Sequence, residues 1–150
     1  MKCVMFVLLV FVACTTAEEG EEIPVERFME LFSISAQEVK TCIHKTGVKR
    51  EHLVAFGDGL EEGAEVSKEF VRKASCYLVC CAHAQGTMVG SQLQMEKIVQ
   101  RIRDIKSTYF DPQLKAMFIT SVKQCEKGVK GIADACDVVF VFIKCLRKKF

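Results

Sequence analysis

Cysteine is the residue type that most constrains what this chain can fold into. Nine cysteines occur in 150 residues, and the stretch SCYLVCCAHAQG at 75–86 holds three of them beside a histidine. Such a cluster is found in catalytic segments, in metal sites and in disulfide frameworks. The compartment in which the chain folds helps to decide among the three, because structural disulfides persist mainly outside the cytosol.

The N-terminus predicts export. Residues 1–17, MKCVMFVLLVFVACTTA, begin with a basic residue, continue with an apolar run from Val4 to Cys14 and end in small residues. This is the pattern of a secretory signal peptide, and the run is shorter than the roughly 20 residues of a membrane helix. We expect residues 1–17 to be removed and residues 18–150 to form one secreted, extracellular domain without membrane insertion. The alternative is a buried N-terminal strand or helix.

The charge of the mature chain excludes some partners. Of the 21 basic residues only Lys2 lies in the signal peptide, and all 19 acidic residues follow it, so the mature chain is close to neutral. A near-neutral chain offers no electrostatic basis for binding nucleic acid or an anionic membrane.

Seven cysteines remain after the signal peptide, so we expect disulfides and one thiol left over. Cys76 and Cys80 are four residues apart and would lie on nearly the same face of a helix, so each needs a different partner. Cys136 and Cys145 are nine apart and would lie on opposite sides of a helix. A helix bridged on both sides would act as a central strut. The seven are Cys42, Cys76, Cys80, Cys81, Cys125, Cys136 and Cys145.

The rest of the mature chain has a helical pattern. Residues with capping side chains precede several apolar periodic segments: Ser35 with Glu38, Ser91, Asp111 before a proline, and Asp134. Glycines mark helix ends, including the run at 57–59. The sequence therefore predicts an all-α single domain of about six helices. They cover residues 28–46, with a break near residue 34 as an alternative, 49–56, 65–84, 91–102, 111–125 and 135–147.

The last of these helices is unusual, because residues 138–143 are apolar on all sides. A helix without a polar face must be surrounded by protein. The alternative is a buried β-strand, since valine, isoleucine and phenylalanine favour strands.

The spacing of six cysteines resembles that of a known family. Counting from Cys42, the gaps between them are 33, 3, 44, 10 and 8 residues, and the local sequences are CYLVC and CDVVFVFIKC. A glycine and then Met88 follow the first of these. Over the whole mature chain this resembles the six-cysteine insect odorant-binding proteins, which include pheromone-binding proteins.

The resemblance implies a disulfide pairing. In that family the first cysteine pairs with the third, the second with the fifth and the fourth with the sixth. This leaves Cys81 as a small buried residue. The alternatives are a reactive or intermolecular thiol at Cys81, or a shifted register in which Cys81 is bridged. The implied bridges are Cys42–Cys80, Cys76–Cys136 and Cys125–Cys145.

One enzymatic interpretation of the cysteine cluster is weak. Secreted phospholipases A2 also carry adjacent cysteines near a histidine, but theirs are followed by two residues and a His-Asp pair. Here one residue separates Cys81 from His83, and Ala84 stands in place of the carboxylate. A glycine-rich calcium loop is also missing upstream. Without the general base and metal ligands we expect no enzyme activity.

The three histidines carry no metal signature. His44, His52 and His83 show no ligand pairing at the spacing of a metal site, so no metal and no cofactor are expected. They are interpreted as ordinary polar residues, and a pH-sensing role for one of them is the alternative.

The remaining function class is binding. The resemblance implies a hydrophobic cavity among the helices, which takes up small hydrophobic molecules by removing their apolar surface from water. The tail after Cys145 is too short for the extra helix that some pheromone-binding relatives insert at low pH, but Phe150 can fold back as part of a wall. The inward positions proposed for ligand binding are Phe56, Met88, Ile98, Ile102, Met117, Phe118, Val122, Val139, Phe140, Ile143 and Phe150.

The expected function is reversible carriage of odorants, pheromones or similar small hydrophobic molecules in an extracellular fluid. The alternative is a secreted, disulfide-stabilised interaction or structural protein with a filled core and no small ligand. A membrane receptor or a second copy of the chain, forming a homodimer, is open as a further partner.

Overall fold

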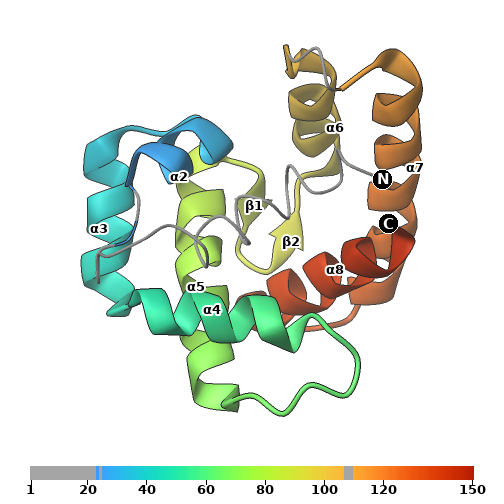
Figure 1. Ribbon diagram of the computed structural model, residues 1–150. Coiled ribbons are helices and arrows are strands. Elements are labelled where there is room, and N and C mark those ends of the chain that lie inside the picture. Colours follow the sequence, from blue (N-terminus) through green and yellow to red (C-terminus); the bar gives the residue numbers. More distant parts are fainter. Residues whose placement is uncertain (1–22, 24, 107–109) are drawn as a thin grey trace.

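The computed structural model describes residue 23 and residues 25–106 and 110–150 (Figure 1). The predicted signal peptide lies outside the described residues. The elements are α2 (Val25–Phe32), α3 (Ala36–Thr46), α4 (Arg50–Gly59), α5 (Lys68–Gln85), β1 (Met88–Val89), β2 (Gln92–Leu93), α6 (Met95–Asp104), α7 (Pro112–Val129) and α8 (Ala135–Lys149).

All six predicted helices are present, and the first is divided into α2 and α3. The capping box that favoured this break is confirmed: Ser35 Oγ accepts from the Glu38 backbone N–H, and the Glu38 carboxylate accepts from the Ser35 N–H at 2.8 Å. Both free N–H groups at the helix start are thereby satisfied. The predicted caps of the last two helices are confirmed as well, since Asp111 and Asp134 both accept backbone N–H groups.

Two predicted boundaries are wrong. The glycines at 57–59 do not end α4, which continues to Gly59. A Cβ at Gly59 would lie 3.2 Å from Val66 Cγ2 and 3.3 Å from Val71 Cγ2, so close packing explains this glycine. Ser91 does not cap α6, because it lies in the turn of an antiparallel hairpin that pairs Met88 with Leu93.

Helix α5 occupies the centre of the domain. It contacts α2, α3, α4, α8 and β1. In Figure 1, α2 and α3 lie on one side of it and α8, α7 and α6 on the other. The prediction that α8 is bridged on both sides is confirmed, since its two disulfides lead to α5 and α7, but the central helix of the domain is α5. The segment 138–143 is helical rather than a strand, and it is not enclosed on all sides, because Val141 is 38% exposed.

Three disulfides join four helices in a row. Cys42–Cys80 links α3 to α5, Cys76–Cys136 links α5 to α8, and Cys125–Cys145 links α7 to α8. This confirms the pairing implied by the family resemblance. Cys81 is free and fully buried, so the shifted register is wrong. The helices that carry most of the core therefore cannot separate without breaking a covalent bond.

Candidate functional site

The C-terminal residue closes an aromatic cluster on α7. Phe118 is 6% exposed and lies between two other rings. The Phe110 ring meets it edge-on with centroids 5.9 Å apart, and the Phe150 ring stacks on it at 5.5 Å. The expectation that Phe150 folds back is confirmed. This group, Phe110, Phe118 and Phe150, is called the α7 aromatic cluster below.

A second aromatic contact joins α4 to α8. Phe56 is fully buried and meets Phe140 edge-on, with centroids 5.6 Å apart. Lys144 covers the outer side of this pair: its Nζ lies 5.6 Å from the centre of the Phe140 ring and donates to the Gly59 carbonyl at 3.2 Å. The apolar stem of the lysine thus shields the ring while its charge stays near water.

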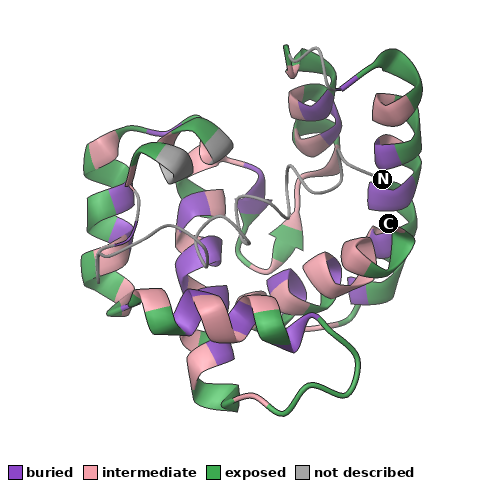
Figure 2. Cartoon of the chain, in the orientation of Figure 1, coloured by how far each residue is buried: buried purple, intermediate pink, exposed green. Residues whose placement is uncertain are grey.

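Most of the predicted binding residues belong to the core. Met88, Ile102, Val122 and Val139 are buried, as are Phe56 and Phe118 (Figure 2). Ile98, Phe140, Ile143 and Phe150 are partly buried and pack against that core.

Met117 is an exception among the predicted residues. Its side chain was expected to point inward, but it is 53% exposed. Met117 precedes the inward Phe118 by one residue, which places it about 100° away around the helix. Of these two neighbours on α7, the inward-facing one is Phe118.

Ser121 is a buried polar residue that the sequence analysis did not single out. It is 9% exposed and stands between Phe118 and Cys125 on the buried face of α7. Its position in the apolar repeat that includes Leu114, Phe118, Val122 and Cys125 was the signal that could have identified it.

His52 has a structural role that the amino-acid sequence did not predict. It is 4% exposed, and its Nδ1 accepts the backbone N–H of Lys49 at 2.8 Å, at the start of α4. Its ring also packs edge-on against Phe70, with centroids 4.7 Å apart. Burial, followed by the charge of Lys73, lowers the pKa of His52 below its usual 6.5. The neutral ring is therefore the form that the fold stabilises.

The free thiol is poorly suited to chemistry. Burial raises the pKa of Cys81 to about 11, only partly opposed by a hydrogen bond with Tyr77. A thiol with so high a pKa carries almost no thiolate at neutral pH, and thiolate is the reactive form. The interpretation of Cys81 as a small buried residue is the one that the structure supports.

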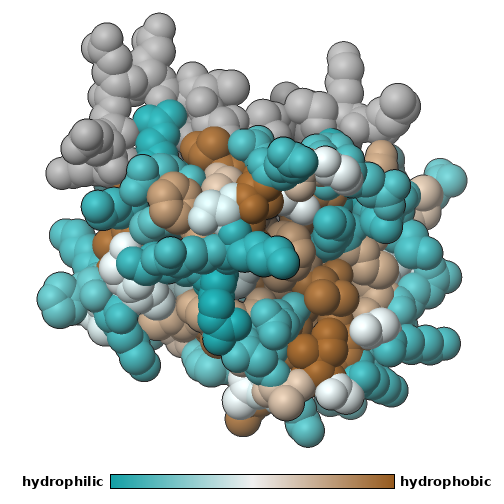
Figure 3. Space-filling view, turned by 90° about the horizontal axis from the view of Figure 1, so that it is seen from below, coloured by the Kyte–Doolittle hydropathy of each residue, from teal (hydrophilic) through white to brown (hydrophobic). Residues whose placement is uncertain are grey.

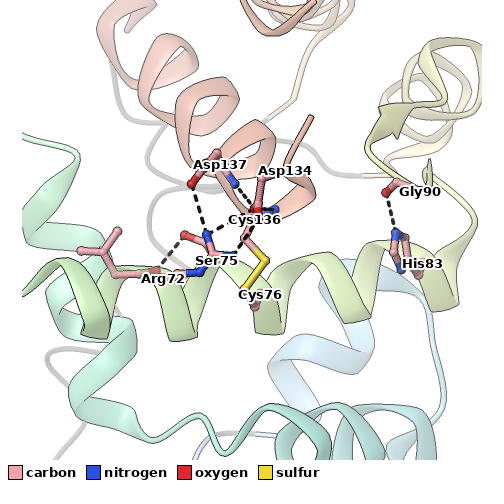
Figure 4. Close-up of a disulfide and its surroundings, with 9 residues drawn as sticks. Arg72, Ser75, Cys76, His83, Gly90, Asp134, Cys136 and Asp137 are labelled. Atoms are coloured by element: carbon pink, nitrogen blue, oxygen red, sulfur yellow. Dashed lines mark hydrogen bonds and ion pairs between the residues drawn. A yellow bond between two sulfur atoms is a disulfide. The ribbon is translucent and has the colours of Figure 1, made fainter. Parts of the chain in front are cut away.

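Polar contacts hold α5 to the start of α8 on the outside of the domain (Figure 4). Arg72 Nη2 lies 2.7 Å from Asp134 Oδ2, and its Nη1 lies 3.5 Å from Asp137 Oδ1. The Arg72 hydrogen bond holds the pKa of Asp134 below its usual range. The same carboxylate accepts the backbone N–H of Cys136, so this pair braces the Cys76–Cys136 disulfide.

An open groove of about 450 Å³ lies on the outer side of α3 and α5. Its walls carry the charged side chains of Lys45, Glu69 and Lys73. The groove is open to solvent, so these charges stay near water beside its apolar lining. The apolar clusters inside the domain are the alternative site. The groove is lined by Lys45, Thr46, Glu69, Arg72, Lys73, Cys76, Val79, Cys80 and His83.

On the face seen in Figure 3, patches of apolar side chains lie among hydrophilic ones. No helix in the described ranges is long and apolar enough to cross a membrane. Within the same ranges, no group of three or more His, Cys, Asp or Glu side chains could hold a metal ion. His83 is exposed, and its Nε2 lies 2.9 Å from the Gly90 carbonyl (Figure 4). This hydrogen bond connects α5 to the hairpin.

The chain matches a known protein family. Residues 25–149 match the PBP/GOBP family, whose members are insect pheromone-binding and general odorant-binding proteins. The match covers nearly all of the chain after the predicted signal peptide. No curated protein sequence matches the chain.

Proposed function

The chain belongs to the PBP/GOBP family, a family of non-enzymatic proteins that bind odorants or pheromones, and on that premise we propose that it is a reversible carrier with an internal apolar binding site. Family membership and the three disulfides indicate an extracellular protein. In this proposal the carrier is secreted after removal of residues 1–17. A membrane receptor, or a second copy of the chain in a homodimer, is the further partner in this proposal.

The observation that carries the proposal is the α7 aromatic cluster. Three rings meet next to the buried Val122: one from α7, one from the segment before it and one from the end of α8. The centroids of neighbouring rings lie within 6 Å of each other. Aromatic and branched side chains gathered in this way offer a large apolar surface to a small molecule. Each 100 Å² of apolar ligand surface removed from water contributes about 2.5 kcal/mol. Micromolar affinity corresponds to about 8 kcal/mol, so the ligand must bury more than about 300 Å² of apolar surface.

In this proposal the disulfides keep such an apolar surface available to a ligand. The bridges Cys125–Cys145 and Cys76–Cys136 fix α8 against α7 and α5. Helices fixed by covalent links are less free to collapse onto one another when the interior is not filled by protein side chains. The proposed lining consists of the α7 aromatic cluster together with Phe56, Met88, Ile98, Ile102, Val122, Val139, Phe140 and Ile143.

The test is titration of mature protein, residues 18–150, with an environment-sensitive apolar fluorophore. Competition with a panel of alcohols, esters, aldehydes and fatty acids follows. Saturable micromolar binding that some panel members reverse supports the carrier. Protein with three intact disulfides and no saturable binding would instead indicate a filled core and an interaction or structural role.

A further inference from the structure

We infer that the open groove on α3 and α5 is a thiol–disulfide exchange site, in which a small anionic thiol attacks Cys76 Sγ and opens the Cys76–Cys136 disulfide. One of the three disulfides is thereby selectively reducible in the folded protein. Neither the reaction nor its test depends on the carrier proposal.

The Cys76–Cys136 disulfide is the most accessible of the three. Both of its cysteines are partly exposed. Each of the other bridges includes one cysteine that is almost fully buried, since Cys42 is 2% exposed and Cys125 is 1% exposed. A thiolate reacts with a disulfide only when it can reach one of the two sulfur atoms. Attack on Cys76–Cys136 therefore requires less movement of the fold than attack on the other two.

The groove reaches this bridge from the side of Cys76. Cys76 belongs to the lining of the groove, whereas its partner Cys136 lies on α8 at the other end of the bond (Figure 4). A thiolate attacks one sulfur of a disulfide and displaces the other. Access from the groove therefore makes Cys76 the attacked residue and Cys136 the leaving group.

The position of Cys136 suits a leaving thiolate. Cys136 is the second residue of α8, where the N–H groups of the first turn favour a negative charge. Asp134 and Asp137 oppose this charge. Arg72 offsets them in part, because its guanidinium lies 2.7 Å from the first carboxylate and 3.5 Å from the second.

The second cysteine that lines the groove, Cys80, is less reactive for the same reason. Attack on Cys80 would release the thiolate of Cys42. Cys42 is almost fully buried, and placing an unpaired charge in an apolar interior is costly. The groove therefore directs exchange to Cys76–Cys136 rather than to Cys42–Cys80.

The charges of the groove favour a thiol that carries an additional negative group. Lys45 and Lys73 line the groove and form no ion pair with any residue of the described ranges. Glu69 lines it as well, so the two lysines exceed it by one positive charge. A small anionic thiol is attracted to such a groove, and a neutral one is not.

The exchange takes place in two steps. The thiolate of the reagent forms a bond with Cys76 Sγ, the Cys76–Cys136 bond breaks, and Cys136 leaves as a thiolate that takes a proton from water. A second reagent thiolate attacks the reagent sulfur of this mixed disulfide and releases Cys76. Two reagent thiols are thereby oxidised to one disulfide as the bridge is reduced. Helix α8 loses its covalent link to α5 and keeps its link to α7.

The experiment exposes folded mature protein, residues 18–150, to the anionic thiol 2-mercaptoethanesulfonate and, in parallel, to neutral 2-mercaptoethanol. Samples taken over time are quenched with acid and their free thiols are alkylated. Peptide mass spectrometry then identifies the reduced bridges and the mixed disulfides. Rates are measured at several thiol concentrations and are expressed per concentration of reagent thiolate.

We expect Cys76–Cys136 to be reduced at least about tenfold faster than Cys125–Cys145, because a buried sulfur reacts only after the fold opens locally. The first mixed disulfide should be on Cys76, and the rate should rise in proportion to the thiol concentration. Reduction that begins at another bridge, or a first mixed disulfide on Cys136, overturns the inference. A rate that is independent of thiol concentration also overturns it, because unfolding would then precede the reaction.

The charge preference is tested with the double variant Lys45→Gln/Lys73→Gln. The ratio of the sulfonate rate to the neutral rate should fall about 2- to 5-fold, the range that exposed charge pairs provide. Lys123→Gln, at an exposed position of α7, is the control and should keep the wild-type ratio. An unchanged ratio in the double variant overturns the assignment of an anionic thiol.

Discussion

Phe150 stacks on Phe118 with the ring centroids 5.5 Å apart and the planes 23° from parallel. This contact joins the last residue of the chain to the middle of α7. The Cys125–Cys145 disulfide joins α7 to α8 at a second point. The C-terminal residue is therefore part of the proposed binding wall, although only five residues follow Cys145.

Replacing Phe150 with alanine should reduce both stability and ligand affinity. The side chain is only half-buried, so we expect the free energy of unfolding to fall by about 1–2 kcal/mol and the affinity to fall several-fold. Urea unfolding and fluorophore titration measure the two effects. Lys149→Ala, at an exposed neighbouring position, is the control and should change neither. Full affinity in Phe150→Ala would remove Phe150 from the site.

Removing a disulfide should cost more when the bridge closes a longer loop. Cys76–Cys136 spans 60 residues and Cys125–Cys145 spans 20. From loop-closure entropy, replacing the first pair with alanines should cost about 4 kcal/mol and replacing the second about 3 kcal/mol. Denaturant unfolding gives both values.

The same variants test whether the disulfides hold the proposed lining residues in place. If the bridges hold the lining residues in place, affinity should decline in the folded fraction of each variant, most of all where α8 is freed from α7. Wild-type affinity in a variant that has lost Cys125–Cys145 would show that the bridge serves stability alone.

Low pH should remove the stabilisation that His52 provides at the start of α4. The pKa of His52 is lower in the folded chain than its unfolded value of 6.5, because the ring is buried and lies near the charge of Lys73. The stabilisation is therefore complete above pH 6.5 and is lost as pH falls through the unfolded pKa toward the folded one. Thermal unfolding between pH 8 and pH 5 should show a decline that His52→Gln reduces. His44→Gln, at an exposed position, is the control and should retain the full decline.

Cys81 should be inert in the folded protein. Its thiol is fully buried with a pKa raised to about 11, so a water-soluble thiol reagent should react slowly under native conditions. One thiol per mature chain should react rapidly once the protein is unfolded without reductant. Rapid native reaction, or more than one thiol after unfolding, would contradict the burial or the pairing.

The parts of the fold that follow from local chemistry could be predicted from sequence. The pairs Ser35–Glu38 and Asp111–Pro112 set helix starts through contacts within one turn, and both predictions are confirmed. The disulfide pairing could not be derived from spacing. It came from the family resemblance, which the bridge Cys42–Cys80 and its two companions confirm.

Features that depend on tertiary packing could not be predicted in this way. Gly59 resembles a helix stop, but it is required by the close approach of Val66 and Val71. Met117 and Phe118 are equally apolar, and only the packing of α7 decides which one faces inward. The cap that His52 provides uses a ring nitrogen in place of a usual capping oxygen, so no standard pattern identifies it.

The most direct test of the carrier account is an NMR measurement of contacts between a bound medium-chain alcohol and the mature protein. The account predicts intermolecular NOEs from the alkyl chain to the ring protons of Phe118 and Phe150 and to the methyl groups of Val122. NOEs confined to residues of the outer groove, such as Lys45, Lys73 and Val79, would place the ligand on the surface and contradict an internal site.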